Sequence, residues 1–334
     1  TRSLIVTGVQ TCALPIYLLT SFEVVFDDLD GCVDLLAPAI LASSNPVIVD
    51  GTLGLGGHTE ALLQRFENLT VIGIDRDEIA LERATKRLAP FADRFKTAHC
   101  VFDQISTVVE SFGFSHINGA LFDLGVSSIQ LDESDRGFSY SQEAPLDMRM
   151  DRSRGITASE IVNTYEPGKL VQILRTYGEE KFATRIVENI VKARAKAPLN
   201  STTELATLVK ESIPAATRRT GGNPAKRTFQ ALRIEANDEL GAITRALPDA
   251  LELLMVGGRL VVMSFQSLED RIVKEIFAEA STSKSPRNLP VELPEYAAKF
   301  SLVFRSSETP TAEELESNPR SASVRLRAIE RVAA

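Results

Sequence analysis

The sequence predicts an α/β protein whose parallel sheet is interrupted by a helical insertion. From Pro46 onwards, short apolar runs alternate with amphipathic stretches, which is the pattern of βα units. A glycine-rich turn follows the first apolar run, as expected where a strand passes into a helix beside a ligand. After the fourth run, roughly a hundred residues contain several helical stretches and no convincing strand. These observations together favour one sheet with a helical insertion.

Each strand is expected where a short apolar run is bounded by turn-forming or charged residues. The expected strands are Pro46–Asp50, Val71–Asp75, Phe95–Phe102, Gly119–Asp123, Arg259–Phe265, Lys299–Phe304 and Ser323–Ile329. The expected helices of the sheet region are Gly57–Phe66, Asp77–Leu88, the stretch Thr228–Leu254, and Ser267–Ala280. We expect Pro248 to break the stretch Thr228–Leu254 into two helices, because proline removes a backbone donor.

The length of 334 residues exceeds that of a usual single domain and fits a core with an insertion. We assign residues 31–135 and 228–334 to the core, and residues 136–227 to an inserted helical domain that binds the substrate. Residues 1–30 are atypical, and we treat them as a leader outside the fold.

The composition is that of a globular protein, with 44% hydrophobic and 25% charged residues. No apolar run reaches the eighteen or so residues that a membrane span needs, so we expect no membrane partner. Cys12, Cys32 and Cys100 are widely spaced and form no CxxC pair, so neither a disulfide framework nor a metal site is expected. Such cysteine usage fits the reducing cytoplasm.

Basic residues gather in the second half of the insertion, although the whole chain carries a net charge of −8. Between Arg185 and Arg233 there are 10 basic residues and 3 acidic ones. Such a stretch is a candidate surface for the phosphates of a nucleic acid. A solvated helix face explains the charge equally well.

The turn Val49–His58 indicates a nucleotide site. Its glycines allow the backbone to approach a ligand and leave helix N-terminal amides free to bind it. Asp75, at the carboxyl end of the adjacent strand, can accept hydrogen bonds from ribose hydroxyls. The alternative role for Asp75 is a cap for the helix that follows. Asp123 ends the fourth strand at the same edge, with a turn-forming role before Gly125 as its alternative.

Two classes of nucleotide-binding protein use such a turn. A nicotinamide-dependent oxidoreductase should continue with a second mononucleotide-binding half. Here an insertion and a terminal strand pair follow instead. The order of elements therefore favours a Rossmann-like sheet that binds S-adenosylmethionine.

Long stretches of this sequence are similar to one family, the ribosomal RNA small-subunit methyltransferase H family, also called MraW. The matching stretches are Asp50–Thr59, Gly73–Asp77, Asp123–Asp132, Arg136–Ser139, Pro145–Asp151, Thr176–Glu180, Arg227–Ile234, Ser264–Arg271 and Asn318–Ala322. The resemblance runs from about Cys32 to Arg331.

The resemblance implies a methyltransferase core with an inserted helical domain, and S-adenosylmethionine as the methyl donor. It implies N4-methylation of a cytosine, cytosine 1402, in the 16S rRNA of the small ribosomal subunit, and it leaves a homodimer open. By position, the family's cofactor contacts fall on Gly56, Gly57, His58, Asp75, Phe102, Asp123 and Gln130. For His58 we prefer packing against the cofactor to a role as general base. Phe102 could be a core residue, but we expect it to stack beside adenine.

For the chemistry, we expect Asp123 or Asp147 to orient the target amine while Ser127 and Ser128 shape the pocket. An ion-paired turn explains the Asp147 segment equally well. The RNA backbone would be held by Arg218, Arg219, Lys226, Arg227 and Arg233. A catalytically silent RNA-binding assembly protein with the same fold is the remaining alternative, besides the oxidoreductase.

Three features depart from the family's pattern. Gln266 stands where the family has histidine, which puts any catalytic role of that position in doubt. Ile129 replaces the usual proline before Gln130. The residues before about Gly31 do not match the start of the family.

Overall fold

Seven strands form one sheet, in the order β3-β2-β1-β4-β5-β7-β6. This computed structural model of the chain describes residues 28–127, 130, 133–215, 223–286, 296–309 and 322–334. The strands are β1 (Val47–Asp50), β2 (Thr70–Asp75), β3 (Phe95–His99), β4 (Ile117–Asp123), β5 (Leu254–Ser264), β6 (Phe300–Leu302) and β7 (Arg325–Arg331). Strands β1 to β5 are parallel, and β7 runs antiparallel to both β5 and β6. The parallel sheet with a terminal strand pair is confirmed.

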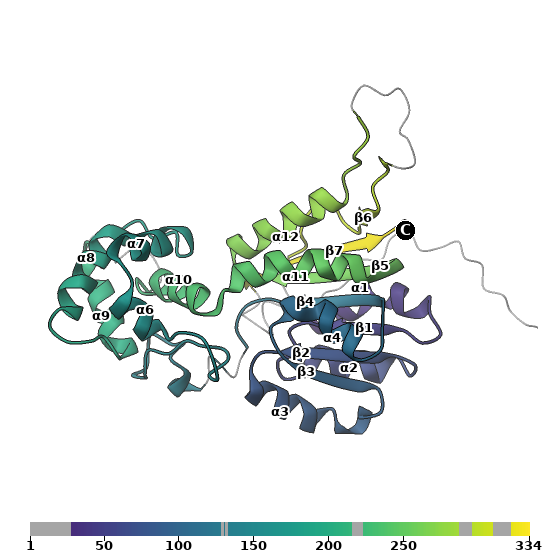
Figure 1. Cartoon of the computed structure of the whole chain (residues 1–334), viewed down its shortest axis with the longest axis horizontal. Coiled ribbons are helices and arrows are strands. Elements are labelled where there is room, and N and C mark those ends of the chain that lie inside the picture. The colour runs from purple at the N-terminus through teal and green to yellow at the C-terminus, as the bar shows by residue number, and fades with distance from the viewer. Residues whose placement is uncertain (1–27, 128–129, 131–132, 216–222, 287–295, 310–321) are drawn as a thin grey trace, which may run out of the picture.

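Helices cover both faces of the sheet (Figure 1). They are α1 (Asp28–Leu41), α2 (Gly57–Arg65), α3 (Glu78–Arg87), α4 (Ile105–Ser111), α11 (Glu239–Leu253) and α12 (Ser267–Ala280). Side chains alternate between the two faces along each strand. Val49 and Ile72 therefore join the core under α4, α11 and α12, whereas Ile48 and Val71 join the core under α1, α2 and α3.

The chain between β4 and α11 forms the expected helical insertion, at one end of the molecule in Figure 1. Its helices are α6 (Ala158–Thr164), α7 (Pro167–Thr176), α8 (Ala183–Arg194), α9 (Thr202–Ser212) and α10 (Lys226–Asn237). They share a separate hydrophobic core, to which α10 contributes Phe229, Ala231 and Leu232. We expected the insertion to end at residue 227. The packing instead places the whole of α10, which ends at Asn237, with the insertion.

Two local expectations need correction. The third strand ends at His99, and Phe102 begins the 3-10 helix η2 (Phe102–Gln104). The helical stretch before β5 is divided at Asp238, whose φ of 49° is left-handed, and Pro248 lies inside α11. Pro248 is exposed, so water can satisfy the carbonyl that its ring leaves unpaired.

Within the described ranges, no helix is long and apolar enough to cross a membrane.

A buried ion pair joins the insertion to the sheet. Arg136, in the segment that leads into the insertion, donates to Asp77 at the start of α3 over 2.8 Å, and the two side chains are 1% and 3% exposed. The same guanidinium nitrogen donates to the carbonyl of Met150 at 2.9 Å. Asp77 also accepts from the side chain of Gln130 at 3.1 Å and caps α3 through the amide of Ile79.

Arg76 makes a second connection beside the first. Its guanidinium donates to the carbonyl of Asn237, the last residue of α10, at 2.7 Å. The side chain of Asn237 in turn accepts from the amide of Met150 and donates to the carbonyl of Met148, both at 2.8 Å. Two consecutive residues after β2 therefore hold both ends of the insertion.

We predict that Asp77→Asn lowers the free energy of unfolding by about 3 kcal/mol, because it leaves the Arg136 charge buried without a counter-charge. Asparagine can still cap α3, so the loss reports on the ion pair. Asp34→Asn is the matched control, since Asp34 and its partner Arg65 are 44% and 47% exposed. Exposed pairs contribute less than about 1 kcal/mol. Equal losses for the two variants in urea denaturation would contradict this prediction.

Candidate functional site

The carboxyl ends of three neighbouring strands meet at one edge of the sheet. Asp75 ends β2, Asp50 ends β1 and Asp123 ends β4. Asp50 pairs with Gly73 of β2 and with Leu121 of β4, so the three strand ends are aligned. Ligands of open α/β sheets bind outside this edge. The structure thus brings Asp75 and Asp123 to the edge where the glycine-rich turn begins.

The turn between β1 and α2 needs glycine at two positions. Gly54 and Gly56 have φ angles of +50° and +76°, which side-chain-bearing residues rarely adopt. At Gly56 a Cβ would also lie 2.9 Å from Leu88. Gly56 precedes α2, whose first amides, from Gly57 and His58 onwards, have no partner within the helix. Those amides can donate to a ligand at the sheet edge.

Asp75 binds this turn to the next strand. One carboxylate oxygen accepts from the amide of Gly54 and the other from the amide of Asp77, both at 2.8 Å. Asp77, not Asp75, caps α3, so the alternative role that we considered for Asp75 belongs to its neighbour. Burial raises the pKa of Asp75 to about 6, because removal from water disfavours the charged form. Its contact with ribose hydroxyls stays a prediction.

Sequence reasoning gave Asp50 no role, although the structure makes it central to the turn. Its side chain is 1% exposed and accepts from the Thr59 hydroxyl at 2.7 Å and from the Thr52 amide at 3.3 Å. Burial raises its pKa, and the nearby His58 partly opposes that effect. The Thr52 hydroxyl in turn accepts from the amide of Asp123 at 2.6 Å. An acidic residue that ends a buried strand before a threonine was the available signal.

His58 lies in the first turn of α2, and its Nε2 atom is buried without a hydrogen-bond partner among the described residues. A buried polar atom without a partner is costly, so such an atom marks a place where a ligand group can bind. The ring thus lies beside the helix amides, where the sequence places the cofactor.

Gln130 and Phe102 lie in the segments that follow β4 and β3. Gln130 is buried, and its side chain donates to Asp77 at 3.1 Å and accepts from the amide of Ser127 at 3.1 Å. Phe102 packs edge-on against Phe122, with ring centroids 5.5 Å apart. It lies partly buried at the margin of the core. Their roles as cofactor contacts stay predictions.

Asp147 lies in the segment that enters the insertion, and it forms an ion pair there. Both of its oxygens accept from the Arg149 guanidinium, at 2.7 and 3.0 Å. Burial opposes ionisation of Asp147, but the hydrogen bonds and charge of Arg149 outweigh it and hold the pKa below its ordinary value. Met148, with φ +63°, turns the chain between them. The structure shows the ion-paired turn, and a role of Asp147 toward the amine stays a prediction.

The basic residues expected to hold RNA have different surroundings. Lys226 and Arg227 are exposed at the start of α10, and Arg227 donates to the carbonyl of Glu179. Arg233 is only 18% exposed and forms two hydrogen bonds of 2.8 Å with Glu239. Four of the residues that we singled out lie outside the described residues: Ser128, Ile129, Arg218 and Arg219.

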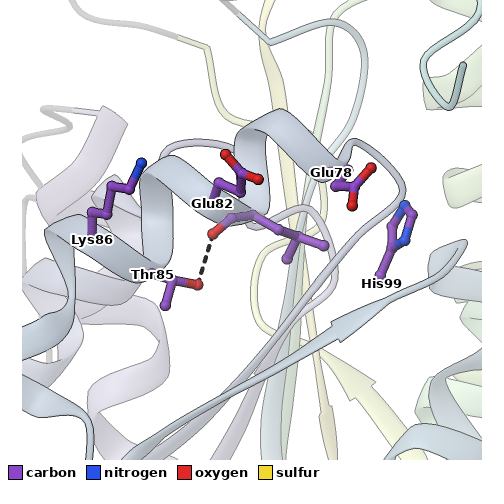
Figure 2. Close-up of a pocket in the computed structure, with 6 residues that line it drawn as sticks. Glu78, Glu82, Thr85, Lys86 and His99 are labelled. Carbon is purple, nitrogen blue, oxygen red and sulfur yellow. Dashed lines mark hydrogen bonds between the residues drawn. The ribbon is translucent and has the colours of Figure 1, made fainter.

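The hollow in Figure 2 lies beside α3 and the end of β3, where His99 pairs with Asp75. Its walls are formed by Glu78, Leu81, Glu82, Thr85, Lys86 and His99. None of these was predicted to bind the cofactor, and the polar groups that converge on the glycine-rich turn are not among them. We therefore place the candidate site at the glycine-rich turn and the ends of β1, β2 and β4, and not in this hollow.

The sheet, its glycine-rich turn and the acidic residue on the next strand define a Rossmann-like, S-adenosylmethionine-dependent methyltransferase. A family model described as the MraW methylase family matches residues 25–332. The chain therefore belongs to the MraW methylase family, as its motifs predicted.

Several relatives that share one name with each other are identical to this chain at about half of the aligned positions. "Ribosomal RNA small subunit methyltransferase H" of Renibacterium salmoninarum is 54% identical over 307 residues, covering 91% of this chain and 93% of that protein. The protein of that name from Thermobifida fusca is 55% identical over 303 residues, covering 91% and 92%. The crystal structure of an rRNA methylase from Streptococcus thermophilus is similar at a TM-score of 0.41 and 12% identity, covering 90% and 94%.

The residues at the edge fit S-adenosylmethionine. The amides at the start of α2 can donate to its polar groups, the carboxylate of Asp75 can accept from its ribose, and the buried Nε2 of His58 lacks a partner among the described residues. When bound, this cofactor supplies a sulfonium methyl group that a nucleophile can attack.

We predict that the affinity for S-adenosylmethionine falls as the pH drops through about 6, the pKa of Asp75. Ionised Asp75 accepts ribose hydrogen bonds, so binding favours the charged form and is strongest above that pKa. The Kd should be constant above about pH 7 and rise by up to about tenfold per pH unit below 6. Calorimetry at a series of pH values measures this. In Asp75→Asn the Kd should be higher than in the native chain and should not rise further at low pH. A Kd of the native chain that does not change between pH 7 and pH 5 would contradict the prediction.

Proposed function

We propose that this chain transfers a methyl group from S-adenosylmethionine to N4 of a cytosine, cytosine 1402, in the 16S rRNA of the small ribosomal subunit. The observation that carries the proposal is the match to the MraW methylase family over residues 25–332, with relatives of 54% and 55% identity named as small-subunit rRNA methyltransferases. The cytoplasm, where ribosomes lie, and a homodimer belong to the same proposal.

The acceptor amine sets the chemical problem. Its lone pair is delocalised into the cytosine ring, so the protein must align it with the methyl group and accept hydrogen bonds from its protons. Asp123 is the first candidate, because β4 ends at the edge that holds the cofactor turn, and its backbone is fixed by Thr52. Asp147 is the second candidate, and it would act only if it exchanged part of its pairing with Arg149.

The insertion supplies the RNA-binding surface in this proposal. A base must be unstacked before its amine can reach the methyl group, so a loop or a partly assembled subunit suits the enzyme better than a duplex. Lys226 and Arg227 are exposed at the start of α10, a short stretch of sequence after Arg218 and Arg219. These four residues would bind phosphates and hold the RNA while the base enters the site.

The direct test is transfer of labelled methyl groups to small ribosomal subunits that lack the modification, with mapping of the product. We expect one N4-methylcytosine per subunit, at cytosine 1402. A chain that binds the RNA and S-adenosylmethionine but transfers no methyl group would instead be a silent assembly protein. Methylation of a different base would replace the proposed target.

Replacing Arg218 and Arg219 together with alanine should weaken RNA binding and lower its salt dependence. Each lost phosphate contact should reduce the slope of log K against log salt by about 0.7 to 0.9. The double variant Lys86→Ala/Lys274→Ala is the matched control, because both lysines are exposed on core helices. Filter binding over a salt series measures the slopes. If cofactor affinity fell instead, Arg218 and Arg219 would support the fold and not the RNA.

A further inference from the structure

Two polar atoms at the carboxyl end of β5 have no hydrogen-bond partner among the residues that the structure describes. They are the hydroxyl of Ser264, whose residue is fully buried, and the side-chain oxygen Oε1 of Gln266. Gln266 continues the extended backbone of the strand, with φ −137° and ψ 154°. Residues two apart on an extended strand point to the same face. Both atoms thus lie on the face whose core contains Leu260 and Val262.

The orientation of the Gln266 carboxamide is fixed by Glu269. Its Nε2 donates to one oxygen of Glu269 at 2.9 Å. The other oxygen of Glu269 accepts from the amides of Phe265 and Gln266, at 2.9 and 3.2 Å. Glu269 is 1% exposed, so these contacts are shielded from water. Gln266 is the N-cap residue of α12, and its side chain and that of Glu269 form the capping box of this helix. The donor end of the amide is occupied, whereas Oε1 is a buried acceptor without a hydrogen-bond partner among the described residues.

This acceptor lies on the sheet edge next to the part that fits the cofactor. The cofactor turn and Asp75 use the ends of β2 and β1, and β4 follows in the sheet order. Beyond β4 comes β5, where Asp123 pairs with Met263 and the amide of Leu124 donates to the Met263 carbonyl at 3.0 Å. Gln266 therefore follows β5 at the strand end beside Asp123, where a group that receives the methyl can lie.

The charges behind Gln266 suit an amine. Glu269 and Glu239 both lie near Arg233, which forms its two hydrogen bonds with Glu239. Burial raises the pKa of Glu269, whereas the three hydrogen bonds that it accepts and the charge of Arg233 favour its ionised form. When Glu269 is ionised, two carboxylates face one guanidinium, which leaves an excess of negative charge. During methyl transfer to an amine, positive charge passes to the nitrogen. A carboxylate that polarises an amide acceptor stabilises that charge, because hydrogen bonds in a chain strengthen one another.

We propose that Gln266 binds the amino group of the target base, with Oε1 accepting one N–H hydrogen bond and Glu269 holding the carboxamide in place. This proposal rests on the proposed function. In the transfer, the bond from nitrogen to methyl carbon forms, the carbon–sulfur bond breaks with its electron pair left on sulfur, and the surplus proton on nitrogen passes to water. Gln266 takes up no proton.

Two variants test this contact. Gln266→Met keeps the length of the side chain and removes the carbonyl acceptor and the amide donor. Gln266→His keeps both functions while its ring is neutral, because one nitrogen can donate to Glu269 and the other can accept. Gln172→Met, at an exposed position of α7, is the matched control. For each chain, kcat at saturating S-adenosylmethionine and KM for unmodified small subunits are measured across pH, with Tm and cofactor Kd.

We expect Gln266→Met to lower kcat by about 10- to 100-fold, measured below its Tm, with the cofactor Kd and the control unchanged. Its Tm should fall, because Glu269 loses the donor to one of its buried oxygens. Gln266→His should retain most of kcat at the alkaline end of the pH series. It should lose kcat as the pH falls through the pKa of the imidazole, which Glu269 raises above its ordinary value of about 6.5, because a protonated imidazole cannot accept. The native chain should lack this added acid limb. Glu269, Glu239 and Arg233 surround the residue in all of the chains, so the comparison isolates position 266.

Two results would overturn the contact. The first is a folded Gln266→Met chain whose kcat stays within about threefold of the native value. The second, which decides the matter if Gln266→Met fails to fold, is a Gln266→His chain without the added acid limb. A native chain that transfers no methyl group overturns the proposed function and this contact with it.

Discussion

The carboxylate of Asp77 is shared by three parts of the chain. It caps α3, accepts from Gln130 after β4, and pairs with the buried Arg136 at the entrance to the insertion. The backbone amide of Asp77 donates to the carboxylate of Asp75, which also accepts from the amide of Gly54 in the turn. Because a buried charge without its partner is costly, loss of the Asp77 charge weakens the connection to Arg136 most. The cofactor edge and the insertion are thus held by one polar cluster.

This cluster has a functional consequence. A methyltransferase must bring a base held by one part of the protein to a methyl group held by another, and small errors in alignment are costly in rate. Here Arg76 holds the end of α10 while Asp77 holds the segment before α6. Both residues follow Asp75 directly. The element that fits the ribose is therefore continuous with the elements that position the insertion.

Sequence patterns predicted the parallel strands and the glycine-rich turn because local rules govern them: apolar runs, and φ angles that only glycine adopts easily. The left-handed break at Asp238 and the packing of α10 with the insertion depend on tertiary contacts, and local pattern placed the break at Pro248 instead. The expected position of Asp75 at the end of the second strand is confirmed, and its role toward the cofactor stays a prediction. Sequence reasoning gave no role to Asp50 and put a catalytic role of Gln266 in doubt, because the hydrogen bonds of both residues depend on partners that the fold brings together.

Hydrogen exchange measured with and without S-adenosylmethionine tests most directly whether cofactor edge and insertion are one unit. The amides of Met148 and Met150, which bond to Arg136 and Asn237, report on the segment that enters the insertion. Our account predicts that the cofactor slows their exchange together with that of the turn Gly51–Gly57, and that Asp77→Asn removes the effect at Met148 and Met150. Protection confined to the turn in the native chain would contradict it.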